Sequence, residues 1–350
     1  MKRIVKLLGA LVIAFSVCVP IIAAGPYYSG ALLQEDATKA AADLYKAWYD
    51  AVVTAKDTLK GVELAQSYVT KYPAGERVSY LKSWLAGPMV RWVLFSQAQL
   101  KKNVPEMIRL TKEAAADDKT KDYPDYPYWV VLSIRDNELL ASPPVTTHLP
   151  DLIEFAKRAI QLIDAGKLPT TGPKDLKKEA ALSGMYFSIA QSEKNLKHLD
   201  QAIEYQKKVV ALDPTNPAVY LFLGIYYNDQ YKDLSDKYSK ILPTDTEKPE
   251  SKALLDSALL SCDNVIEAWV PFLALTVKDN KFPNRSDIEK VVAQLYIYRH
   301  PDKGAAGLQQ VINEWKPGQP VIKPVATAPP TTVGTTPAAV TPAATTPKPK

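Results

Sequence analysis

One pattern occurs twice between residues 186 and 227, at a spacing of 34 residues. An aromatic, an aliphatic and a small residue stand at matching places in the two copies: Tyr186, Ile189 and Ala190, then Tyr220, Leu223 and Gly224. A fixed period of this length is typical of chains built from stacked helix–turn–helix units. The apolar residues recur every three or four positions, which places them on one face of a helix. The sequence therefore predicts an all-α fold of antiparallel helix pairs.

The stretch between the two copies, DQAIEYQKKVVALDPTNP, resembles the second helix and closing turn of the tetratricopeptide repeat family. Ala202 stands at its small-residue position, and Pro214 stands where the family ends its helix, since proline lacks an N–H. The chain departs from the family pattern at Glu193, Gln206 and Val209. The resemblance implies these repeat-packing residues: Tyr186, Ala190, Ala202, Pro214, Tyr220 and Gly224.

The resemblance also implies an α-solenoid whose concave face holds a protein or peptide segment. In the family that face is lined by set positions of each first helix, which here are Phe187, Gln191, Lys194, Leu221, Ile225 and Asn228. Some members hold a peptide's C-terminal carboxylate with lysines and asparagines at these places. Phe187 and Leu221 do not supply them, so carboxylate capture is disfavoured.

The rest of the body has apolar residues at helical spacing throughout and is long enough for one extended array or two small domains. We expect one helical array over residues 37–315, preceded by a linker over 25–36. Residues 45–73 look like a diverged repeat. Gly87-Pro88 predicts a break, and Pro271 predicts a bend in a mostly buried helix. Further helices are expected at 105–116 with Asn103 as N-cap, 129–139, 253–275, 288–298 and 305–315.

The two ends of the chain have different compositions. Residues 1–24 place three cations before an apolar run, which predicts a secretory signal peptide cleaved after Ala24, with an uncleaved membrane anchor as the alternative. Cys18 could be a lipid-attachment site, but a small residue is expected before such a cysteine and Val17 stands there, which argues against lipidation. Residues 316–350 are almost wholly Pro, Thr, Ala, Val and Lys, which predicts a disordered tail.

Charge and motif content narrow the classes of function. The net charge is +5, but three cations lie in the signal and four in the tail, so the region between them carries −2. A nucleic-acid partner is therefore not expected. The three histidines, read as surface or loop residues, lack metal-ligand spacing, and no phosphate loop or nucleophile elbow occurs. We expect no catalytic, cofactor or metal residues, and Cys262 is expected to be a buried, inert thiol.

These features predict a non-enzymatic exported scaffold that binds proteins or peptides in the cell envelope, periplasmic or secreted, with membrane contact only if its N-terminal segment is uncleaved or lipidated. One alternative is a structural component of the outer-envelope assembly machinery, which would need lipidation at Cys18. A diverged envelope enzyme is the other. The aromatic loop 123–129 is either an exposed stacking patch or packs on its own helices. The partner and the oligomeric state do not follow from these residues.

Overall fold

The structure is a computed structural model that describes residues 29–277, 282–319 and 321. Within these residues it is all-helical and contains no strand, which confirms the predicted fold class at that level. The chain divides into two compact units, Met1–Gly87 and Pro88–Lys350. The predicted signal peptide and nearly all of the predicted tail lie outside the described residues.

The first unit packs its helices around a small aromatic core. Trp48 and Tyr68 are buried there, and Trp48 meets Trp84 edge-on at 5.3 Å. The side chain of Asp57 accepts a hydrogen bond from the Lys60 N–H and so caps the second helix. Its elements are α1 (Ser29–Tyr49), the π-helical turn η1 (Asp50–Thr54), α2 (Thr58–Lys71) and α3 (Val78–Leu85). Helix α1 thus begins inside the stretch 25–36 for which a linker was predicted.

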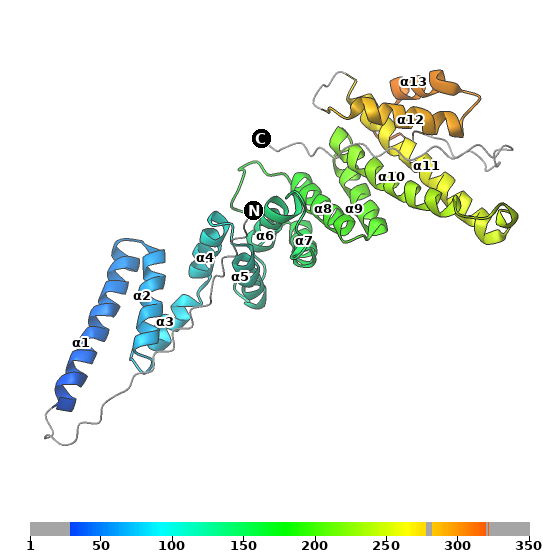
Figure 1. Ribbon diagram of the computed structural model, residues 1–350. Coiled ribbons are helices and arrows are strands. Elements are labelled where there is room, and N and C mark those ends of the chain that lie inside the picture. The colour runs from blue at the N-terminus through cyan, green and yellow to red at the C-terminus, as the bar shows by residue number, and fades with distance from the viewer. Residues whose placement is uncertain (1–28, 278–281, 320, 322–350) are drawn as a thin grey trace, which may run out of the picture. The chain divides into compact units, whose positions relative to one another are not determined.

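The second unit packs every helix from α4 to α13 against the next helix in the sequence, and Figure 1 shows them following one another in chain order. Short loops between α4 and α5, between α8 and α9, and between α9 and α10 favour this packing of consecutive helices. The elements are α4 (Pro88–Leu100), α5 (Val104–Ala116), α6 (Asp125–Ile134), η2 (Arg135–Leu139), α7 (Leu149–Asp164), α8 (Lys178–Asn195), α9 (Leu199–Leu212), α10 (Pro217–Tyr238), η3 (Pro243–Asp245), α11 (Pro249–Leu275), α12 (Arg285–Arg299) and α13 (Gly304–Glu314).

Several helix boundaries lie where proline and capping residues predict them. Pro88 opens α4 directly after the break at Gly87, because its missing N–H is harmless in a first turn. Asn103 caps α5 by accepting a hydrogen bond from the Glu106 N–H at 3.2 Å. Asn216 does the same for α10, where its Oδ1 lies 3.0 Å from the Ala218 N–H. The break at Gly87-Pro88 and the cap at Asn103 are therefore confirmed.

The small residues of the repeat pattern lie at close helix contacts. Ala190 and Ala202 are fully buried. A Cβ on Gly224 would lie 2.1 Å from Cδ1 and Nε1 of Trp269, so only glycine lets α11 approach this closely. The Trp269 Nε1–H donates to the Leu221 carbonyl oxygen at 3.2 Å across the same contact. Helices α10 and α11 are thereby held together at the centre of the second unit's core.

Helix α11 is the one described helix that is long and apolar enough to cross a membrane. However, 61% of its most apolar stretch is buried inside the unit. Arg299 of α12 donates two hydrogen bonds to the Asp263 carboxylate, at 2.7 and 2.8 Å, which fastens α12 to α11. Pro271 lies within the helix, as expected. Core packing is a sufficient reason for its apolar composition.

The aromatic loop packs mainly on its own helices. Tyr126 and Tyr128 are buried, while Tyr123 is exposed. Helix α6 begins at Asp125, four residues before the predicted start, and continues as a π-helix to Leu139. The buried Asp125 carboxylate accepts hydrogen bonds from the N–H and hydroxyl groups of both Thr170 and Thr171. These bonds hold the long loop that leads from α7 into α8.

Candidate functional site

Helices α8 and α10 meet through side-chain contacts beside the six residues to which the resemblance assigns binding. The ring of Phe187 on α8 meets that of Phe222 on α10 edge-on, with centroids 5.1 Å apart. Two turns further along α8, the Lys194 ammonium pairs with the Asp229 carboxylate at 3.0 Å. These contacts link the two helices, and the surface that carries the six predicted residues is named here the α8–α10 face.

The six predicted residues differ in how accessible they are on this face. Five are half-buried: Phe187, Gln191, Lys194, Leu221 and Ile225. Asn228 is only 3% exposed. Its expected place on an open binding surface is therefore wrong. Leu221 and Ile225 also pack against the second unit's core cluster, so they are structural as well as exposed.

Lys194 does not offer a free cation to a ligand. Besides pairing with Asp229, its ammonium lies 5.5 Å from the centre of the Tyr226 ring, an ordinary cation–π distance. Its charge is thus already balanced by the protein.

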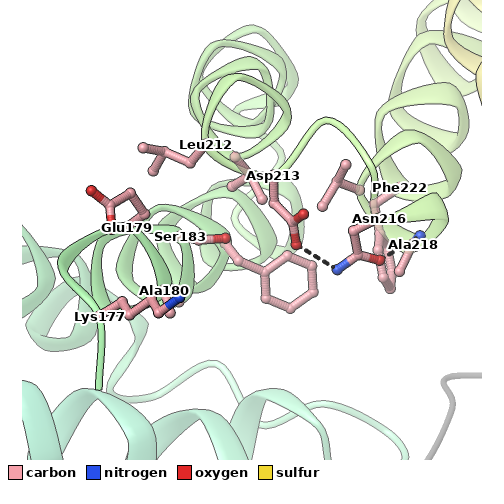
Figure 2. A pocket seen from close by; sticks show the side chains of 13 residues that line it. Lys177, Glu179, Ala180, Ser183, Leu212, Asp213, Asn216, Ala218 and Phe222 are labelled. Carbon is pink, nitrogen blue, oxygen red and sulfur yellow. Dashed lines mark hydrogen bonds between the residues drawn. The ribbon is translucent and has the colours of Figure 1, made fainter. Parts of the chain in front are cut away.

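A pocket of about 550 Å³ opens beside Phe187, between the first half of α8, the end of α9 and the start of α10. Val209 and Val219 are buried at its apolar base. Figure 2 shows its opposite sides, with Glu179 and Ser183 on one helix and Asn216 and Phe222 on another. The remaining lining residues are Lys177, Ala180, Gly184, Phe187, Leu212, Asp213 and Ala218.

The rim of the pocket is polar and fixed by hydrogen bonds. The Asn216 amide donates to Asp213 at 3.0 Å while its oxygen caps α10, as the dashed lines in Figure 2 show. Lys177 and Glu179 are exposed at the other side of the opening. The volume lies in the range of ligand pockets, and the apolar base with a few placed polar groups is also typical of them.

Of the six predicted binding residues, only Phe187 lines this pocket. The sequence reading missed Phe222, Leu212 and Asp213. A local signal for them existed, since Leu212 and Asp213 directly precede the predicted helix-ending Pro214, where the chain turns back towards α8. Their meeting with α8 is a tertiary contact, and the repeat pattern alone did not rank them above their neighbours.

No protein-family model matches the chain, and a search of curated proteins finds no match either.

The predicted packing residues lie around the same three helices. The Tyr220 hydroxyl donates to the Pro214 carbonyl oxygen at 3.1 Å, which ties the α9–α10 turn to α10. Tyr186 is half-buried, and the Lys208 ammonium lies 5.3 Å from the centre of its ring and 4.7 Å from that of Tyr205. These contacts join α9 to α8 and fix the turn between α9 and α10.

The cysteine and the histidines outside this site are either buried or within hydrogen-bond distance of a neighbouring carboxylate. Cys262 is fully buried, and burial raises the pKa of its thiol, as expected for an inert cysteine. His300 lies in the loop after α12, which confirms the loop alternative, but it is buried beside the Tyr296 ring and is not a surface residue. His148 and His198 each lie within hydrogen-bond distance of a carboxylate, of Glu138 and Glu193 respectively. Among the described residues, no three His, Cys, Asp or Glu side chains cluster as a metal site would.

Proposed function

We propose that this protein is a non-enzymatic scaffold, an α-solenoid similar to tetratricopeptide repeat proteins, which binds a protein or peptide segment on its α8–α10 face. The observation that carries the proposal is the apolar pocket of about 550 Å³ beside the paired rings of Phe187 and Phe222. Half-buried rings in a concave, partly apolar site are typical anchors for a bound segment.

The packing of the second unit supports the solenoid part of this proposal. Each helix contacts its sequence neighbours, and the small residues of the repeat lie at the contacts between helices. In such arrays stability comes from neighbouring repeats, so surface residues are left free for binding. In this arrangement the half-buried residues of α8 and α10 remain accessible to a partner on the α8–α10 face.

The function is tested by capture of partners from the cell envelope with the purified chain, followed by mass spectrometry. The test variant is Phe187→Ala with Ile225→Ala, because both side chains lie half-buried on the face. The matched control is Leu260→Ala, which removes a 62% exposed apolar side chain from α11. We expect a partner that the intact chain and the control recover and the face variant loses.

Thermal melting of each variant completes this test. The two face positions contact the core cluster, so some loss of stability is expected, and capture must be measured well below the lower melting temperature. Recovery of every partner by a folded face variant would contradict binding on the α8–α10 face. Asp substitutions would be a poorer choice, because they would place charge against the core.

We further propose export, with a soluble mature chain that begins at Gly25. Its basis is the cationic and then apolar N-terminal sequence. Peptide sequencing and the intact mass of the protein from its native cell test this directly. A start at Cys18 with an added lipid mass would instead favour the envelope-assembly lipoprotein, and an intact N-terminus would favour the membrane anchor.

A further inference from the structure

The described chain ends close to the pocket. Trp315, which follows α13, lies edge-on against the ring of Tyr220 in the first turn of α10, with centroids 5.7 Å apart. The Trp315 indole donates to the Gln319 carbonyl oxygen at 3.3 Å, so the chain stays beside this contact after the helix ends. Val321, the last described residue, packs against the same core cluster as Tyr220. The proline-rich segment 322–350 therefore starts beside the first turn of α10.

The same turn forms one wall of the pocket. Val219 and Phe222 line the pocket and flank Tyr220 in the helix. The Tyr220 hydroxyl bonds to the carbonyl of Pro214, which directly follows the rim residue Asp213. The segment 322–350 thus begins beside a helix turn that also contributes residues to the pocket.

The composition of segment 322–350 suits this pocket. It contains seven prolines and several valines, with no aromatic and no acidic residue. Proline-rich segments in the polyproline II conformation dock into grooves lined by aromatic rings, and they lose little entropy on binding. The pocket supplies the ring pair of Phe187 and Phe222 above a base of aliphatic residues.

The charges of segment 322–350 and of the pocket are also complementary, although this is a weaker argument than composition. The cationic side chains of the segment are Lys323, Lys348 and Lys350, and it has no anionic side chain. The charged side chains that line the pocket are Lys177, Glu179 and Asp213, so carboxylates are in the majority. Rim charges contribute mainly to orientation and rate of binding.

We propose that the proline-rich segment 322–350 folds back within its own chain and occupies the pocket between α8, α9 and α10. The tail is then an intramolecular occupant that a partner must displace. Competition between the tail and a partner rests on the proposed binding function, whereas occupancy of the pocket by the tail does not depend on it. A covalent tether holds a segment at an effective concentration on the order of millimolar, so even a weak site is filled.

The test is photo-crosslinking in the intact chain through Lys350. A photoreactive benzoylphenylalanine replaces Ala180, which is exposed on the rim of the pocket. The control places it at Leu260, which is exposed on α11 and does not line the pocket. We expect crosslinks from position 180 to peptides of segment 322–350 within single chains, roughly tenfold more than from position 260, because the tether keeps the site filled.

A pocket-filling variant gives the specificity control. Gly184 lines the pocket, and a Cβ there would meet no atom within 4 Å, so a side chain can start from this position without a clash at its first atom. Combined with the position 180 crosslinker, Gly184→Trp should lower the tail crosslinks roughly tenfold, whereas Gly184→Ala should leave them unchanged, because alanine leaves the tethered tail room to bind. Apart from Ala180, which carries the crosslinker, both variants keep every native side chain of the pocket.

Three results would overturn the inference: no tail crosslinks from position 180, equal crosslinks from position 260, or crosslinks that form only between chains. Unchanged crosslinking in a folded Gly184→Trp variant would also do so. Partner capture does not enter this experiment. If the face variant loses its partners and no tail crosslinks form, the proposed function stands and the tail is rejected as occupant of the pocket. If tail crosslinks form and the face variant still captures every partner, the tail is the occupant and binding on the α8–α10 face is rejected.

Discussion

Replacing Gly224 with alanine adds one methyl group at the closest contact between α10 and α11. The new Cβ would lie 2.1 Å from Cδ1 and Nε1 of Trp269 and 2.6 Å from its Cε2. The Trp269 side chain is fully buried, so the ring has no open space to move into. We therefore expect Gly224→Ala to force the two helices apart.

The expected change in the free energy of unfolding of Gly224→Ala is the sum of three contributions. Overpacking of this kind costs about 1 to 3 kcal/mol. A displaced ring also loses the hydrogen bond from its Nε1–H to the Leu221 carbonyl oxygen, which adds about 1 kcal/mol. Alanine offsets about 1 kcal/mol, because glycine is the poorer helix former. The net expectation is a loss of about 2 kcal/mol in the free energy of unfolding, or a melting temperature lower by about 4 to 8 °C for a unit of this size.

Gly184→Ala is the matched control, since it makes the same chemical change inside a helix where the added Cβ meets nothing within 4 Å. It should be neutral or stabilising by up to about 1 kcal/mol. Thermal unfolding followed by circular dichroism measures both variants. Equal melting temperatures for Gly224→Ala and Gly184→Ala would refute the close contact with Trp269.

Three further predictions concern the packing of the second unit. Ala202→Leu should lower the free energy of unfolding by about 1 to 3 kcal/mol, because the residue is fully buried, and an unchanged melting midpoint would contradict its place in the core. Arg299→Met should cost about 1 to 3 kcal/mol in urea unfolding, because it leaves the Asp263 carboxylate without its bidentate partner, and the double variant with Asp263→Asn should cost less than the sum. Burial lowers the pKa of His300 below its ordinary value, so the unfolded chain binds a proton that the folded chain resists. Stability should fall as the pH drops through this window below 6.5, and His300→Phe, which keeps a ring beside Tyr296, should flatten this part of the melting-temperature profile.

The helices were predictable because their signals are local. The proline at position 88 and the side-chain cap at Asn103 act within one turn of their own helix, and both boundaries lie where the sequence predicts them. The small residues Ala190 and Gly224 were also identified, from the 34-residue period, and Ala202 was identified from the resemblance of its helix to the repeat family. The start of α1 at Ser29 was missed, since the composition of that stretch carries no comparable signal.

The site was less predictable because it depends on contacts between distant segments. Trp269 is far from Gly224 in the sequence, and no local pattern indicates that the two meet. Asn228 was placed on the open face by its repeat position, but its orientation on α10 turns it into the core. His300 directly follows the end of α12, where exposure is common, yet contact with the ring of Tyr296 buries it.

The central claim, that the α8–α10 face binds a protein segment, is tested most directly by hydrogen exchange of the intact chain with and without the captured partner. The account predicts slower exchange in residues 178–195 and 217–231 when the partner is added, and no such change in the Phe187→Ala, Ile225→Ala variant. Slower exchange confined to α1–α3, or to the loop around Tyr123, with unchanged exchange in α8 and α10, would contradict it.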